Sequence, residues 1–264
     1  MSAAVRAETR KLLSTRLWWI LLLGMTLYMA FLGAVLAFSL GELTKAGAAS
    51  PLEPGDVVRS VYSLATSLGY AFPLVVGALL ITSEFRHKTV TPTFLFEPRR
   101  HVVLLAKLVV AGVTGLVFGV AGTIGALAGG VPVLAFQDVG PMLGDGGVWA
   151  IIALSVLSLG LWCLVGVGLG SVLPDQVASI VVVLAFTQLV EPLLRFGLSA
   201  VDSLAGIAQF LPGAAAEAIV GSSLYTTTGS VDLLTRWQGA LVMIGYVVVL
   251  AGIGWRTTLR RDVT

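Results

Sequence analysis

The chain has 264 residues, of which 57% are hydrophobic and only 11% are charged, and its formal net charge is +2. A soluble domain usually carries about 25% charged residues, so this composition excludes an ordinary water-soluble protein and predicts an all-helical, polytopic membrane protein. The single cysteine, Cys163, excludes an intramolecular disulfide. The two histidines, His87 and His101, lie far from any cysteine or acidic cluster, so no metal site is predicted.

Residues 1–16 form a polar arm that mixes cations with Val5, Leu12 and Leu13 and precedes two tryptophans, Trp18 and Trp19. This pattern favours an amphipathic helix in the membrane interface, with the tryptophans in the aromatic belt. The alternative is a plain positively charged flank with a frayed start.

Six stretches are long and apolar enough to cross about 30 Å of hydrocarbon as helices. They are residues 17–40, 60–81, 102–127, 148–173, 176–198 and 238–255. Pro73 predicts a kink within the second stretch. Three Gly-x-x-x-Gly motifs permit close helix packing, and they begin at Gly115, Gly125 and Gly166.

The connection after the second stretch, residues 83–100, reads SEFRHKTVTPTFLFEPRR and concentrates charge in a chain that has little. Glu84 and Lys88 are four residues apart, so we expect them to pair on one helix face. A short capped helix with exposed aromatic side chains on such a connection is typical of a segment that docks into a groove of a partner protein. The alternative is a solvated interfacial loop with no partner.

The short helix is predicted from its capping residues. Thr91 is a candidate N-cap with Pro92 at the first helical position, and the helix should end before Pro98. Phe94, Leu95 and Phe96 are expected to give it an apolar surface.

The fifth stretch contains Glu191 and Arg195, which are spaced i, i+4. We expect the two to neutralise each other near the outer end of the span, and a substrate or proton role is the alternative. In residues 200–237, an apolar segment is broken at Pro212 and Gly213. It is too interrupted to span, so it predicts a re-entrant or outer-surface pair of helices buried against protein.

The orientation follows from the lysines and arginines, because these residues collect on the cytoplasmic side. Twelve of the 16 fall on one side of the six crossings: Arg6, Arg10, Lys11, Arg16, Arg86, Lys88, Arg99, Arg100, Lys107, Arg256, Arg260 and Arg261. Both termini, the 83–100 connection and the tail at 256–264 are therefore predicted to be cytoplasmic, with the protein in the cell membrane.

Motifs for nucleotide and catalytic chemistry are missing from the sequence. It contains no G-x-x-x-x-G-K-[ST] phosphate-binding loop, no H-E-x-x-H and no G-x-S-x-G. No nucleophile and base are arranged together, so the chain is not expected to be an enzyme and no cofactor of its own is predicted.

Over its whole length the sequence resembles the permease subunits of type-2 ATP-binding-cassette (ABC) exporters. The most specific part is Pro73 followed by GALLITSEFRHKTVTPTFLFEPRRHVVLLAKLVVAG, with weaker likeness in AETRKLLSTRLWW, FLPGAAAEAIVG and LRRDV. The chain departs from the pattern at Lys88, where many relatives carry glycine.

The resemblance implies one transmembrane domain over residues 1–264, with an N-terminal interfacial helix, six spans, a coupling helix within 83–100 and outer re-entrant helices. Residues that match the coupling element are Glu84, Phe85, Arg86 and Thr89, and Phe94 and Phe96 are expected to contact the ATPase. The implied partners are a cytoplasmic ATP-binding-cassette ATPase, which would bind ATP and Mg²⁺, and a second permease copy, identical or related, in the lipid bilayer. No nucleic acid is implied.

The substrate class that suits a largely apolar lining is amphiphilic or hydrophobic: a lipid, a drug or an antibiotic. The alternative function is a secondary transporter or channel without an ATPase. Against it, no internal repeat is visible and the spans hold few ionisable groups, which ion-coupled carriers usually retain.

Overall fold

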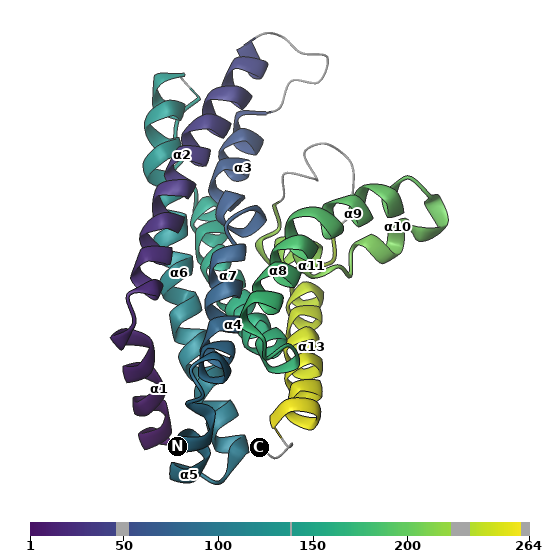
Figure 1. The fold of residues 1–264 in the computed structure, drawn as a ribbon. Coiled ribbons are helices and arrows are strands. Elements are labelled where there is room, and N and C mark those ends of the chain that lie inside the picture. The colour runs from purple at the N-terminus through teal and green to yellow at the C-terminus, as the bar shows by residue number, and fades with distance from the viewer. Residues whose placement is uncertain (46–52, 138, 223–232, 260–264) are drawn as a thin grey trace.

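The computed structural model describes residues 1–45, 53–137, 139–222 and 233–259, and every regular element in these ranges is a helix. The helices form an elongated bundle (Figure 1). Six helical segments are long and apolar enough to cross a membrane: Leu17–Leu43, Pro54–Arg86, Arg100–Phe136, Gly146–Val172, Gln176–Ser199 and Arg236–Thr258. The six predicted spans are therefore confirmed as helices.

The elements follow one another along the chain. Their bounds are α1 Ser2–Ser14, α2 Leu17–Lys45, α3 Pro54–Ser67, α4 Ala71–Arg86, α5 Val90–Phe96, α6 Arg100–Phe136, α7 Gly146–Val172, α8 Gln176–Ala185, the π-helix η1 Phe186–Val190, α9 Glu191–Ser199, α10 Asp202–Ala208, α11 Pro212–Val220, α13 Arg236–Gly254 and the π-helix η2 Trp255–Leu259.

The second and fifth membrane-length segments are both irregular. In the second, α3 and α4 are separated by a turn at residues 68–70, just before Pro73. Proline has no N–H and clashes with the carbonyl four residues earlier, so the predicted kink is confirmed there. In the fifth, η1 interrupts the α-helix and Pro192 follows at the start of α9. Such π-helical insertions occur often at functional sites.

Glycines bring the central helices into close contact. A Cβ at Gly115 would overlap Gly160 of α7, one at Gly129 would overlap Ala30 of α2, and one at Gly166 would overlap Leu74 of α4. The Gly-x-x-x-Gly motifs thus lie between helices of one chain, where α6 packs along α2 and α7 and α4 packs along α7.

One end of the bundle gathers the segments that were predicted to be cytoplasmic. Figure 1 shows the N-terminal end of α1, the short α5 and the lower end of α13 at the same end of the molecule. The turn between α7 and α8 lies there too, because Arg86 Nη1 donates a hydrogen bond to Gln176 Oε1 at 3.3 Å. This arrangement agrees with an even number of crossings, and the side of the membrane on which this end lies stays a prediction.

The predicted break at Pro212 is confirmed, because α11 begins at that residue. All nine residues of α11 are buried, against α3, α7 and α13. The short α10 precedes it, so the segment is a pair of helices, as expected, but α10 exposes Leu204 and Ile207 and is not buried against protein as predicted. Residues 223–232 of the predicted outer segment lie outside the described residues.

Candidate functional site

The connection between the second and third membrane-length segments contains the predicted short helix, but its start was placed wrongly. The helix α5 begins after Thr89 rather than Thr91, and no side chain caps it. Pro92 therefore sits in the middle of the first turn, which tolerates proline because the N–H groups there need no intrahelical partner. The helix ends at Phe96, ahead of Pro98, as predicted.

The predicted pair of Glu84 with Lys88 is also wrong. The helix α4 ends at Arg86, and Lys88 has a φ of 55°, in the left-handed region that favours glycine. Lys88 therefore leaves the helix face on which Glu84 lies, and Glu84 pairs with Lys11 of α1 and Lys107 of α6 instead.

Four side chains make up what we name the basal charge cluster: Glu8, Lys11, Glu84 and Lys107. The Nζ of Lys107 lies 2.6 Å from Glu8 Oε2 and 3.0 Å from Glu84 Oε1. The Nζ of Lys11 lies 2.7 Å from Glu8 Oε1 and 2.6 Å from Glu84 Oε1. Two carboxylates thus meet two ammonium groups, and the cluster joins α1, α4 and α6 without excess charge.

Burial explains why these charges gather. Glu8, Glu84 and Lys107 expose only 4%, 6% and 3% of their surface. A buried charge is costly unless it is paired and its remaining hydrogen bonds are made, and Lys107 also donates to the carbonyl of Leu80 at 2.8 Å. Partial burial acts to lower the pKa of Lys11, but hydrogen bonds to Glu8 and Glu84 outweigh it and raise that pKa above its ordinary 10.5.

The N-terminal helix is attached to the bundle by apolar contacts as well. Val5 and Leu12 pack on a core cluster that includes Leu80 and Leu104. The apolar face of α1 was predicted to lie in the membrane interface. At Val5 and Leu12 this face packs against protein instead. Figure 1 shows α1 below α2, beside the lower part of α6. The helix itself is confirmed, and its position relative to a membrane stays a prediction.

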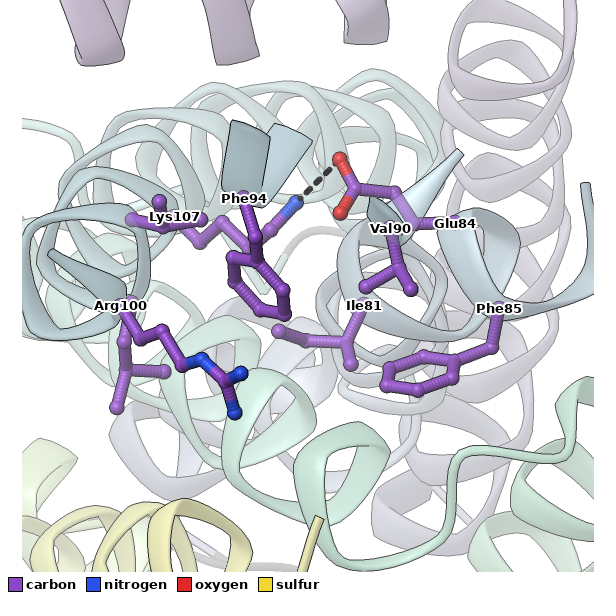
Figure 2. Close-up of a pocket in the computed structure, with 9 residues that line it drawn as sticks. Ile81, Glu84, Phe85, Val90, Phe94, Arg100 and Lys107 are labelled. Carbon is purple, nitrogen blue, oxygen red and sulfur yellow. Dashed lines mark ion pairs between the residues drawn. The ribbon is translucent and has the colours of Figure 1, made fainter. Parts of the chain in front are cut away.

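Under α5 lies a small pocket lined by aromatic and charged side chains. Its open space is about 10 Å³, close to the size of one water molecule. Figure 2 shows Phe85 and Phe94 on either side of Ile81, with the Glu84–Lys107 ion pair alongside. The guanidinium of Arg100 lies 5.0 Å from the centre of the Phe94 ring, a cation–π contact.

The predicted contact residues divide into two groups. Phe85 and Phe94 are half-buried and pack against the core, so Phe94 does not face outward as expected, because its side of α5 rests on α4 and α6. Phe96 is 92% exposed and its neighbour Leu95 is 77% exposed. Arg86 and Thr89 are exposed as well. The outward apolar surface of α5 is therefore Leu95 and Phe96.

Exposed basic residues flank α5 in the sequence. Arg86 and Lys88 precede it and Arg99 follows it, and all three are exposed. Arg99 forms an ion pair with Glu97, with 2.9 Å between Nε and Oε1, and this hydrogen bond lowers the pKa of Glu97.

A second polar site lies away from the basal charge cluster, about halfway up the bundle, where Figure 1 shows α9 and α11. The predicted pair of Glu191 and Arg195 is confirmed, with 3.0 Å between Oε1 and Nη2. Glu217 of α11 joins it, with Oε2 at 2.8 Å from Arg195 Nη1. The backbone N–H of Gly213 donates to Glu191 Oε1 at 2.6 Å. This site therefore ties α9 to α11.

The sequence interpretation did not single out Glu8, Lys11, Lys107 or Glu217 as site residues. A signal was present for two of them. Lys107 lies two turns inside an apolar helix and Glu217 lies within the apolar segment GAAAEAIV. A charge in such surroundings requires a partner of opposite sign. Which partner it meets depends on helix packing, which no local pattern reveals.

Comparison with known proteins does not assign this chain to a family. No protein-family model matches the sequence, and no curated protein matches it significantly.

Proposed function

We propose that this chain is the membrane subunit of an ATP-driven exporter of the type-2 ABC class, which binds a separate cytoplasmic ATPase. The observation that carries the proposal is the two-sided character of α5. Its outer side presents Leu95 and Phe96 to solvent at the end of the bundle, and its inner side rests on α4 and α6 through Phe94. Exposed aromatic residues on a fixed short helix suit docking into an apolar groove.

The inner side of α5 offers a route by which movement of an ATPase would reach the spans. The N–H of Thr89 donates to the carbonyl of Glu84 at 2.9 Å, so the link between α4 and α5 is tight. The carboxylate of Glu84 is bonded in turn to Lys11 and Lys107. A displacement of α5 would therefore move α1, α4 and α6 together. The helix α4 is itself the second half of the broken second membrane-length segment. ATP and Mg²⁺ would be bound by the partner.

Large apolar side chains on α2, α9 and α13 are exposed, among them Phe31, Leu193 and Val248. In our proposal these faces meet lipid and a second permease copy. A translocation path with such apolar walls would carry an amphiphilic or hydrophobic substrate.

Co-purification tests the proposal directly. The chain, held in lipid nanodiscs, is mixed with an ABC ATPase, which our proposal expects the neighbouring reading frame to encode. Leu95→Ala/Phe96→Ala should lower the retained ATPase at least tenfold, because buried aromatic contacts dominate interfaces. The control is Phe136→Ala, whose side chain is 88% exposed at the far end of α6. Absence of ATPase binding by the unaltered permease, or equal binding by both variants, contradicts the proposal.

A second candidate, a secondary transporter without an ATPase, is favoured by one observation: the buried Glu191–Arg195–Glu217 site, because ion-coupled carriers keep ionisable groups within their spans. Transport assays in sealed vesicles separate the two. ATP with the ATPase present should drive export, whereas an imposed proton gradient alone should not.

A further inference from the structure

The site formed by Glu191, Arg195 and Glu217 holds two carboxyl groups and one guanidinium group. The three residues expose only 1%, 5% and 2% of their surface. Arg195 contacts both carboxyl groups, one with each terminal nitrogen. We refer to these three residues as the α9–α11 acid site.

The surrounding sequence supplies no further positive charge. Residues 196–235 contain no lysine, arginine or histidine. Arg236, the next cation along the chain, is exposed and lies against Gly221, at the end of α11. With both carboxyl groups ionised, the site would bury one negative charge in excess. An excess buried charge is strongly unfavourable, and proteins usually avoid it by neutralising the group.

The hydrogen bonds of Glu191 indicate where neutralisation occurs. Its Oε1 accepts from Arg195 Nη2 and from the N–H of Gly213. Its Oε2 is buried and has no hydrogen-bond partner among the residues that the structure describes. A proton on Oε2 would remove the charge while leaving Oε1, as a carbonyl oxygen, able to accept both hydrogen bonds.

A metal cation fits this site less well than a proton. Cations such as Ca²⁺ need six to eight oxygen ligands. Within the described part of the chain, no group of three or more His, Cys, Asp or Glu could hold a metal ion. The backbone of Gly213 also packs so closely that a single Cβ there would overlap both Arg195 and Glu191. A proton needs no additional space.

Other elements around the site contribute few titratable groups. On α13, the hydroxyl of Tyr246 donates to the carbonyl of Phe210. From α7, the neutral Ser158 reaches the carbonyl of Ala216. On α10, the side chain of Asp202 lies outside the described residues. Glu217 is thus the described carboxyl group that shares Arg195 with Glu191.

We propose that the α9–α11 acid site is a proton-binding site, with Glu191 Oε2 as the atom that carries the proton in this structure. Release of the proton leaves two carboxylates competing for one guanidinium across the contact between α9 and α11. Their repulsion and their need for water favour separation of the two helices. The proton therefore holds α11 against the fifth membrane-length segment. This proposal stands independently of the ATPase.

Infrared difference spectroscopy on the protein in nanodiscs tests for the proton directly. At neutral pH the unaltered protein should show the carbonyl stretch of one protonated carboxylic acid, which shifts in heavy water and disappears at alkaline pH. Glu191→Gln and Glu217→Gln should each abolish this band, because one carboxylate and Arg195 then balance. The exposed Glu53→Gln is the control and should retain it.

Thermal unfolding gives a second readout with a defined sign. At neutral pH the folded site holds a proton that an exposed glutamate has already released at about pH 4.3, so the melting temperature should fall as the pH rises above this value. Either amide variant should reduce this dependence, whereas Glu53→Gln should not. The amides reproduce the shape of the protonated acid, so failure of both variants to fold would overturn the proposal. Absence of the carbonyl band from the unaltered protein would overturn it equally.

Discussion

The ammonium group of Lys11 donates a hydrogen bond to the hydroxyl of Thr93, with 3.0 Å between Nζ and Oγ1, and so connects α1 to α5 across 82 positions of sequence. The same ammonium group pairs with Glu8 and Glu84. Lys11 therefore links the N-terminal helix to both segments that would carry movement into the bundle.

The pH dependence of this link follows from the charge of Lys11. Its pKa in the folded protein is raised above 10.5, so the stabilisation is fully present below pH 10.5 and is lost as the pH rises through the higher folded value. The protection of α1 against hydrogen exchange, taken relative to the base-catalysed rate of an unfolded chain at the same pH, should therefore fall only under strongly alkaline conditions. In Lys11→Met we expect α1 to exchange roughly fivefold faster at neutral pH, a loss of about 1 kcal/mol, discounted because this side chain is 42% exposed.

Lys11→Arg is the matched control, because arginine keeps its charge in the alkaline range. Its α1 should stay protected at a pH where α1 of the unaltered protein has begun to exchange. Equal alkaline behaviour of the two proteins would contradict the role of this ammonium group.

Charge balance in the basal charge cluster predicts that a second substitution should restore part of the stability lost through the first. Glu84→Gln leaves two ammonium groups with one carboxylate and should lower the free energy of unfolding by about 3 kcal/mol, the cost of breaking a buried pair. Adding Lys107→Met leaves Glu8 and Lys11 as a neutral pair and should recover at least half of the loss. Thermal unfolding in detergent measures both. Additive losses in the double variant would show that the charges act separately.

Two phenylalanines of α5 should differ in how much they contribute to the stability of the isolated protein. Phe94→Ala removes a half-buried ring from the pocket and should cost about 2 kcal/mol of stability. Phe96→Ala removes an exposed ring and should change stability by less than about 0.5 kcal/mol. Melting temperatures without the ATPase provide the comparison. A destabilised Phe96→Ala variant would mean that this ring has a structural role.

The backbone of Lys88 offers a stabilising change. A non-glycine residue in the left-handed region is strained by about 1–2 kcal/mol, part of which glycine loses again through its greater freedom in the unfolded chain. Lys88→Gly should therefore gain about 0.5 kcal/mol. Arg86→Gly, within the last turn of α4, should lose about 1 kcal/mol instead. The same sign for both variants in thermal unfolding would contradict this account.

The orientation in the membrane can be tested by cysteine labelling. Thr89 is exposed at the α5 end, and Gly144 is exposed in the connection before α7, while the native Cys163 is buried. A membrane-impermeant maleimide on intact cells should label Gly144→Cys, and Thr89→Cys only after permeabilisation. Ser222 is a poorer probe of the outer side, because it is buried against Ser63. Labelling of both positions from one side would contradict the six-crossing arrangement.

Local patterns predicted the features that depend on nearby residues. Apolar length identified the six membrane-length helices, Pro73 predicted the break between α3 and α4, and the i, i+4 spacing predicted the pair of Glu191 with Arg195. Each of these depends on hydrogen bonds or contacts within a few turns of one helix.

The failures concern side chains whose partners are distant in sequence. Lys88 is four residues from Glu84, but the chain turns at residues 87–89, so Lys88 does not lie on the helix face of Glu84. Helix packing places Lys107 next to the Glu84 carboxylate instead. Glu8 meets Lys107 across 99 positions. Likewise, only the docking of α5 on α4 and α6 decides that Phe94 faces inward and Phe96 outward.

The glycine motifs have a consequence for how copies of this chain would meet in a bilayer. Their close approaches are already occupied by neighbouring helices of the same chain, and the exposed sides of α2, α9 and α13 carry bulky groups such as Phe31, Leu193 and Val248. Bulky surfaces keep backbones apart and gain little over the lipid chains that they replace. Pairing through such faces would therefore depend on the thickness and acyl order of the bilayer, and the same chain would associate differently in membranes of different composition.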